Sequence, residues 1–198
     1  AAQLGATFSA EEVYGLFRQV GAELRCAGIT INFAPVVDLS SSDRAFSRDP
    51  EVVTRYAAAV VDGLLDAGIL PCLKHFVGYG GASCDAHASL PTAEWDPDAL
   101  IPYRNLLDRV PMIMTAHLRI PDLDPNHCVT LSHPSVSGLL REELGFQGVI
   151  VTDSLTMHGV LEEAGSLEEA AIQALEAGCD LLLLGGPSLQ GDLFEPLD

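Results

Sequence analysis

Basic residues are scarce in this sequence of 198 residues, which holds 10 lysines and arginines against 28 aspartates and glutamates. The formal net charge at pH 7 is therefore -18, with histidine counted as neutral. Because like charges repel, this balance disfavours nonspecific binding to nucleic acids and to anionic membranes. We accordingly expect neither a nucleic acid nor a membrane as a partner, and solubility is the simplest role for the acidic surface.

Long apolar runs and paired cysteine motifs are also lacking. No apolar stretch approaches the roughly 20 residues that span a bilayer, and no charged-then-apolar leader stands at the N-terminus. The cysteines have no C-x-x-C spacing, which suits reduced, buried thiols better than a disulfide framework: Cys26, Cys72, Cys84, Cys128 and Cys179. These features do not assign a compartment, although they favour the cytoplasm over export.

Apolar, β-branched runs alternate with helix-like stretches along the chain. Runs that are apolar throughout are typical of parallel strands buried on both faces. Helices are delimited by capping residues and glycine stops, for example the capping box of Ser9 and Glu12 or the Asp49-Pro50 start before Gly68. The predicted strands are 31–37, 71–73, 111–116, 149–152 and 181–184, and the predicted helices are 9–27, 52–67, 102–109, 134–144 and 166–177. The predicted order is a helix, four βα units and a fifth strand.

The length and the apolar content of 48% suffice for one buried core, so residues 1–198 are interpreted as a single domain. A doubly wound sheet and a (β/α)8 barrel both fit the order of elements. Four of the five predicted strands end in polar residues, and a barrel draws catalytic residues from several strands at one face. The prediction is therefore an α/β fold, an incomplete (β/α)8 TIM barrel. A closed barrel has eight units and about 250 residues, so we expect the missing units in a longer parent chain.

The segment from Lys74 to His87 is the richest in polar chemistry. Lys74 and His75 end the second strand, and three glycines within four residues then allow a loop to fold over a pocket. Asp85 and His87 stand two apart, and an aspartate can orient a histidine as a proton donor. From the spacing alone, a surface Asp and His in a flexible loop is the commoner case.

A carboxylate, Asp153, follows a strand that is otherwise wholly apolar. Such a charge must be hydrogen-bonded, paired or used in chemistry, because an unpaired charge there is costly. As an N-cap of the next segment it would be satisfied without any function. Both interpretations stay open at this stage, and we expect Asp153 to converge with Lys74 and His75 on one pocket.

Two further polar residues lie near the predicted strand ends. Arg44 could hold a ligand hydroxyl or carboxylate, or form a structural pair with Asp43 or Asp38. His117 could be a ligand, a base or a hydrogen-bonded core histidine, and we favour the last interpretation.

Together these segments resemble the barrel domain of glycoside hydrolase family 3, in its β-N-acetylglucosaminidase branch. The similarity rests on residues 28–38, the arginine-bearing loop, the Lys-His-Phe motif with its glycine-rich loop and Asp-x-His, and residues 139–157. Val77 and Tyr79 depart from the proline and histidine that this branch commonly has. The family's earlier Asp-x-Glu-Gly-Gly-like substrate segment also has no counterpart in the chain.

The resemblance implies a retaining, exo-acting glycosidase that cleaves terminal β-linked N-acetylglucosamine from chitin- or peptidoglycan-derived fragments through a covalent glycosyl-enzyme. A small carbohydrate is the implied partner, and no cofactor or metal is implied. The implied site consists of a nucleophile, Asp153; a general acid/base, His87; its dyad partner, Asp85; and three residues that hold sugar hydroxyls, Arg44, Lys74 and His75.

Three alternatives stay open. The first is a β-glucosidase or β-xylosidase of the same family, since a tyrosine in the glycine-rich loop also resembles the glucosidase branch. The second is a metal-dependent hydrolase, with ligands drawn from His75, Asp85, His87, His117 and Asp153. The third is an inactive truncated fragment.

Overall fold

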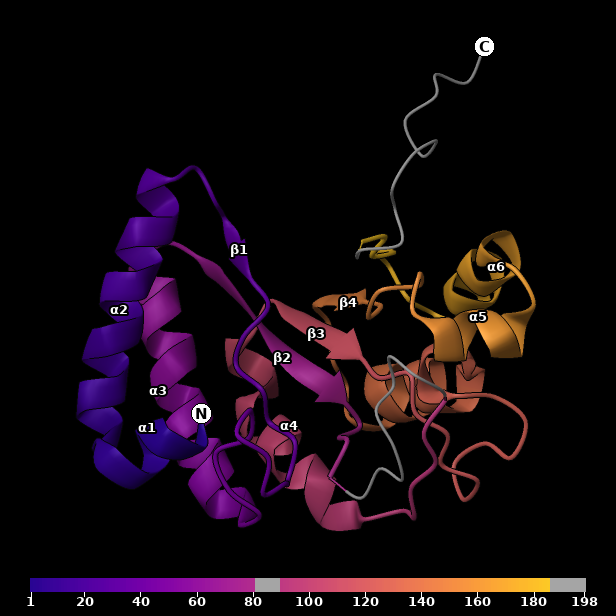
Figure 1. Ribbon diagram of the computed structural model, residues 1–198, viewed down its shortest axis with the longest axis horizontal. Helices are drawn as coiled ribbons and strands as arrows, with labels where there is room; N and C mark the ends of the chain where they lie inside the picture. Colours follow the sequence, from indigo (N-terminus) through magenta and orange to yellow (C-terminus); the bar gives the residue numbers. More distant parts are fainter. Residues whose placement is uncertain (81–89, 186–198) are drawn as a thin grey trace.

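The computed structural model describes residues 1–80 and 90–185 of the chain. Its centre is a four-stranded parallel sheet in which spatial order follows sequence order, β1-β2-β3-β4 (Figure 1). The paired residues include Ile31 with Leu70, Cys72 with Met112, and Met112 with Val149. The strands are β1 (Ile31–Asn32), β2 (Leu70–Phe76), β3 (Met112–Thr115) and β4 (Val149–Val151).

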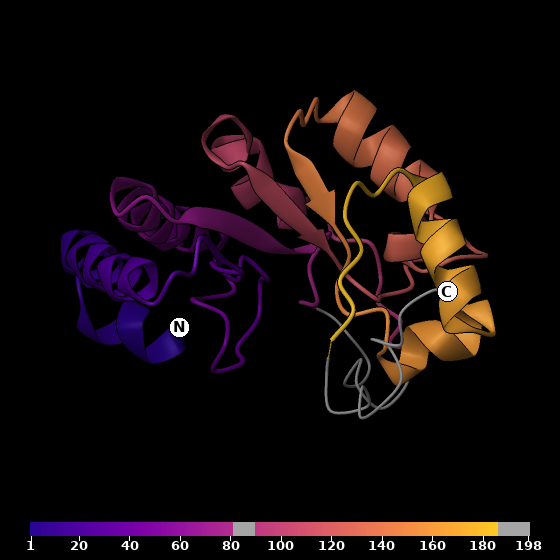
Figure 2. The ribbon, with the colours of Figure 1, turned by 90° about the horizontal axis from the view of Figure 1, so that it is seen from above.

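Helices lie between successive strands, as a parallel sheet requires. Seen from above, the strands fan out into a curved sheet, with α3, α4 and η4 along its convex side (Figure 2). The helices are α1 (Ala2–Thr7), α2 (Ala10–Cys26), α3 (Pro50–Asp66), η1 (Pro97–Leu100), α4 (Ile101–Leu106), η2 (Leu107–Arg109), η3 (Val129–Leu131), the π-helix η4 (Pro134–Glu143), α5 (His158–Ala164) and α6 (Leu167–Ala177). None of the helices in the described ranges has the length and apolar character that a membrane span needs.

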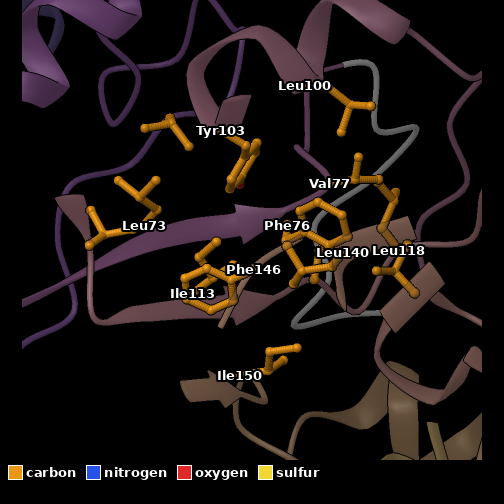
Figure 3. Packing of buried hydrophobic residues seen from close by; sticks show 14 of the residues in the cluster. Leu73, Phe76, Val77, Leu100, Tyr103, Ile113, Leu118, Leu140, Phe146 and Ile150 are labelled. Atoms are coloured by element: carbon orange, nitrogen blue, oxygen red, sulfur yellow. The ribbon is translucent and has the colours of Figure 1, made fainter. Parts of the chain in front are cut away.

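Both faces of the sheet are apolar. On the convex side, Leu73, Ile113 and Ile150 come from three neighbouring strands and join the large core beneath the helices (Figure 3). On the concave side, a second cluster contains Cys72 and Val151 together with two methionines of β3. Side chains alternate between the two faces along a strand, so this double burial confirms the prediction of parallel strands covered on both sides.

Several predicted bounds are wrong, and the departures have local causes. The first strand is short because Pro35 has no N–H to donate to a ladder, although Val36 forms an isolated bridge to Lys74. The second strand is longer than predicted and includes Lys74 and His75. The predicted fifth strand forms only a single bridge, from Leu181 to Val151, within the described residues.

The helix predictions hold best where a capping side chain is present. Ser9 and Glu12 form the expected capping box of α2, and Asp49 accepts backbone hydrogen bonds at the start of α3. The third helix begins earlier than predicted, as the 3-10 turn η1 capped by Asp96, and α1 and α5 were not predicted. Among the thiols expected to be buried, Cys26 is exposed, whereas Cys72, Cys128 and Cys179 are buried without disulfides; Cys84 lies outside the described residues.

Candidate active site

Lys74 and Asp153 share the concave side of the sheet at its carboxyl edge. Cys72 and Val151 point into the concave cluster, and residues two positions further along point the same way. Burial lowers the pKa of Lys74, the neighbouring Arg44 lowers it further, and the negative charge of Asp153 raises it. Lys74 therefore lies within electrostatic reach of both Arg44 and Asp153, as expected for the strand ends of a barrel.

The carboxylate of Asp153 is half-buried and only partly engaged. Its Oδ1 accepts a hydrogen bond of 2.7 Å from the backbone N–H of Ser154, and its Oδ2 has no hydrogen-bond partner among the described residues. The next helix, α5, begins at His158 and has Met157 at its N-cap position. The interpretation of Asp153 as an N-cap is therefore wrong, and one carboxylate oxygen is available for chemistry.

Lys74 and its neighbour Arg44 form no structural ion pair with the described residues. Arg44 is exposed and forms no ion pair with Asp38, Asp43 or any other carboxylate in the described ranges. The ammonium group of Lys74 likewise has no hydrogen bond within residues 1–80 and 90–185. The alternative of a structural Arg44 pair is thus not observed, and both side chains can hold the hydroxyl groups of a ligand.

His75 is held in a fixed orientation by Asp38, which follows the short first strand. Asp38 Oδ2 lies 2.9 Å from Nδ1 of His75, and Oδ1 accepts hydrogen bonds from the backbone N–H groups of His75 and Tyr79. Both partners of the pair are buried. Because a carboxylate can only accept, Nδ1 carries a proton and donates it to Asp38, and the pair fixes the direction of Nε2.

His117 is fully buried at the end of β3. Its Nδ1 lies 2.9 Å from Oγ1 of Thr130, and its Nε2 lies 2.9 Å from the carbonyl oxygen of Ser154. Burial lowers the pKa of its imidazole, so the ring is held neutral. The structure agrees with the interpretation of His117 as a hydrogen-bonded core histidine, and neither ring nitrogen is left for a metal.

Tyr79 links the two histidines. Its hydroxyl oxygen accepts a hydrogen bond of 2.9 Å from the backbone N–H of His117, and its ring meets that of His75 edge-on at 5.0 Å between centroids. Burial, followed by the charge of Asp153, raises the pKa of the phenol, which therefore stays protonated. Tyr79, which stands where the family branch commonly has a histidine, thus contacts both histidines of the site.

Asp85 and His87 lie outside the described residues, so their pairing as an acid/base dyad stays a prediction. Two of the five residues considered as metal ligands are therefore not placed. Within the part of the chain that the structure describes, no group of three or more His, Cys, Asp or Glu side chains is arranged to hold a metal ion.

The sequence did not predict the supporting roles of Thr130 and Ser154. Thr130 lies in η3, 13 residues after His117, and no motif joins the two. Ser154 acts through backbone atoms, which leave no signal in a sequence pattern. Only the placement of Ser154 directly after Asp153 pointed to this neighbourhood.

Comparisons with known proteins identify the family of the chain. The family model "Glycosyl hydrolase family 3 N terminal domain" matches residues 1–191. The chain is 38% identical over 200 residues to "Beta-hexosaminidase LpqI" of Mycobacterium tuberculosis, covering 92% of this chain and 51% of that protein. The chain thus spans about half the length of this curated relative.

Solved structures show the same similarity. A glycoside hydrolase family 3 β-N-acetylglucosaminidase from Paenibacillus sp. superposes with a TM-score of 0.86 at 38% identity, covering 92% of this chain and 37% of that one. NagZ from Neisseria gonorrhoeae, in complex with N-trifluoroacetyl-D-glucosamine, superposes at 0.78 with 34% identity, over 88% of this chain and 53% of that one. The predicted fold class, an α/β domain consistent with an incomplete TIM barrel, is confirmed. The chain belongs to glycoside hydrolase family 3, and these relatives carry the names β-hexosaminidase and β-N-acetylglucosaminidase.

Proposed function

We propose that the protein is a retaining, exo-acting glycosidase that removes terminal β-linked N-acetylglucosamine from chitin- or peptidoglycan-derived fragments. The observation that carries the proposal is Oδ2 of Asp153, which has no hydrogen-bond partner within residues 1–80 and 90–185 and lies at the carboxyl edge of the sheet, within electrostatic reach of Lys74. The names of the relatives, β-hexosaminidase and β-N-acetylglucosaminidase, support the choice of sugar.

The chemistry assigns a separate task to each group. Asp153 attacks the anomeric carbon and forms a glycosyl-enzyme, while His87, oriented by Asp85, donates a proton to the departing oxygen. His87 then takes a proton from water, which attacks the same carbon and releases Asp153. Lys74, Arg44 and Nε2 of His75 hold hydroxyl groups of the terminal sugar during both steps.

Replacement of the nucleophile tests the proposal. In the full-length gene product, Asp153→Ala should lower turnover of an aryl N-acetyl-β-glucosaminide by about 10,000-fold or more, as for other deleted nucleophiles. Asp108→Ala is the matched control, because Asp108 is exposed in η2 and lies outside the site. A variant at position 153 that keeps near-normal single-turnover rates would remove Asp153 from this role.

The same assay separates the alternatives. Turnover of an aryl β-glucoside well above that of the N-acetylglucosaminide would support the β-glucosidase interpretation. Loss of activity on treatment with a chelator would support a metal-dependent hydrolase. The proposal expects preference for the N-acetylated substrate and no effect of the chelator.

A further inference from the structure

The backbone around Asp153 is held from two sides. Toward the end of the described chain, the N–H of Leu155 donates to the carbonyl of Leu183 at 2.9 Å, and Thr156 Oγ1 donates to the carbonyl of Gly185 at 2.7 Å. Toward β3, the carbonyl of Ser154 accepts from Nε2 of His117 at 2.9 Å. The peptide groups of Ser154 are therefore fixed in direction.

Ser154 connects this support to the reactive carboxylate. Its carbonyl is held by His117, and its N–H donates to Oδ1 of Asp153 at 2.7 Å. A carboxylate with one oxygen fixed in this way has its other oxygen aimed in a defined direction. The orientation of Asp153 Oδ2 thus depends on how firmly His117 holds the neighbouring residue.

The imidazole of His117 is set in one tautomer. A carbonyl oxygen can only accept, so Nε2 must carry the proton, and Nδ1 of the neutral ring is then an acceptor. The hydroxyl of Thr130, 2.9 Å away, shares its one proton between Nδ1 and the carbonyl oxygen of Ala116, which also lies at 2.9 Å. Thr130 Oγ1 is itself 2.8 Å from Oγ1 of Thr115, within β3. The two threonines therefore tie the ring to the rigid sheet.

The backbone of His117 is fixed as well. Its N–H donates to the hydroxyl of Tyr79, whose own N–H is bonded to Asp38. His117 thus joins the Asp38–His75 pair, which faces the sugar in the proposed function, to the strand end that carries Asp153.

We propose that His117 is a positioning residue, which aims Asp153 at the anomeric carbon by holding the Ser154 carbonyl through Nε2–H. The inference rests on the proposed role of Asp153 as nucleophile. His117 does not touch the sugar, so its loss should slow the formation of the glycosyl-enzyme and leave substrate binding nearly unchanged.

The test compares His117→Met with His117→Gln in the full-length gene product. Glutamine keeps an N–H donor near the position of Nε2, whereas methionine fills the space without a donor. The readout is the rate at which a fluorinated aryl N-acetylglucosaminide labels each folded molecule, with KM measured alongside. Ile113→Ala is the matched control, since Ile113 is a buried residue of β3 that faces the helices.

We expect His117→Met to reach native labelling stoichiometry at a rate about 100-fold lower, the effect of a misplacement near 1 Å, with KM within about threefold. His117→Gln should be labelled at least about tenfold faster than His117→Met, and Ile113→Ala should be labelled at the native rate. If His117→Met does not fold, Thr130→Val, which removes the partner of Nδ1, should show the same slowing.

Two failures can be told apart by peptide mapping of the label. A native protein that is not labelled on Asp153 overturns the proposed function and this inference with it. A native protein that is labelled on Asp153, with His117→Met or its Thr130→Val substitute equally fast, overturns the positioning role alone. Equal slowing by Ile113→Ala would also overturn it, because the effect would then be one of general destabilisation.

Discussion

Lys74 lowers the stability of the folded state, although its proposed role is to bind the substrate. Its pKa is lowered, first by burial and then by Arg44, so the unfolded chain binds this proton more tightly than the folded one. The folded state is therefore penalised at neutral pH, and the penalty is lost as pH rises through the folded pKa toward the unfolded value of about 10.4. A cation kept in place at such a cost is typical of a functional site.

Replacement of this lysine should separate stability from binding. Lys74→Met should raise the urea midpoint of the full-length gene product at pH 7, because methionine fills similar space without a charge. It should also raise KM for the aryl N-acetylglucosaminide by about 10- to 100-fold, through the loss of a charged hydrogen bond. A lower midpoint would show that the ammonium group stabilises the fold instead.

His117 should make stability fall on acidification. Burial lowers the pKa of this histidine in the folded state, so between about pH 6.5 and that lowered value the unfolded chain binds one more proton. In this window the native protein should lose up to about 1.4 kcal/mol per pH unit more than His117→Gln. Unfolding free energies from urea titrations at pH 7.5 and 5.5 measure the difference, and parallel slopes for both proteins would contradict it.

At the scale of elements, the contact between α2 and α3 depends on a glycine. A Cβ added at Gly63 would lie 2.6 Å from the carbonyl oxygen of Tyr14 and 2.9 Å from the backbone nitrogen of Arg18, both in α2. The backbones of the two helices therefore approach too closely for any side chain at this position. Rigid backbone atoms cannot give way as the end of a side chain can.

Replacement of glycine by alanine should have opposite effects on stability at two positions, one in α3 and one in α2. Gly63→Ala should destabilise the protein by about 1–3 kcal/mol, because overpacking outweighs the better helix propensity of alanine. Gly15→Ala, exposed in α2 with nothing within 4 Å of its Cβ, should stabilise by about 0.5–1 kcal/mol. Hydrogen exchange of the α2 and α3 amides measures both changes. If both substitutions stabilised the protein, helix propensity alone would control the stability at these positions.

Among the helices, the sequence predicted those whose ends carry their own chemical signals. Ser9, Asp49 and Ser166 cap α2, α3 and α6 as expected, because a cap is a contact between residues three positions apart or fewer. The N-cap residues of α1 and α5, Ala1 and Met157, have no such side-chain bond, and neither helix was predicted. Local signals thus account for the successes and their absence for the failures.

At the scale of the whole molecule, apolar side chains are exposed at both ends of the sheet. Leu70 is 43% exposed beside the short β1, and Leu181 is 44% exposed beside β4. Ile29 and Val149 extend these two surfaces. In a barrel such positions are covered by neighbouring βα units, so they are where further chain would pack.

Residues 1–198 expressed alone should therefore behave poorly despite the charge of -18. Exposed strand edges and apolar surface favour self-association, so we expect dimers, low solubility or a broad thermal transition. Light scattering and calorimetry of the isolated polypeptide measure this. A monodisperse monomer with sharp two-state unfolding would show that these units close or cap themselves.

Periodicity and capping are short-range properties of the chain, so they were enough to predict the order of βα units, the parallel sheet and the strand ends that carry Lys74 and Asp153. Tertiary structure alone decided that Asp38 binds His75, 37 positions away, and that His117 holds the carbonyl of Ser154. These partners meet only because parallel strands bring their carboxyl ends to one edge. Which side chains then come into contact depends on how far each strand extends and on how the chain bends after it. No local sequence pattern encodes these distances between strand ends.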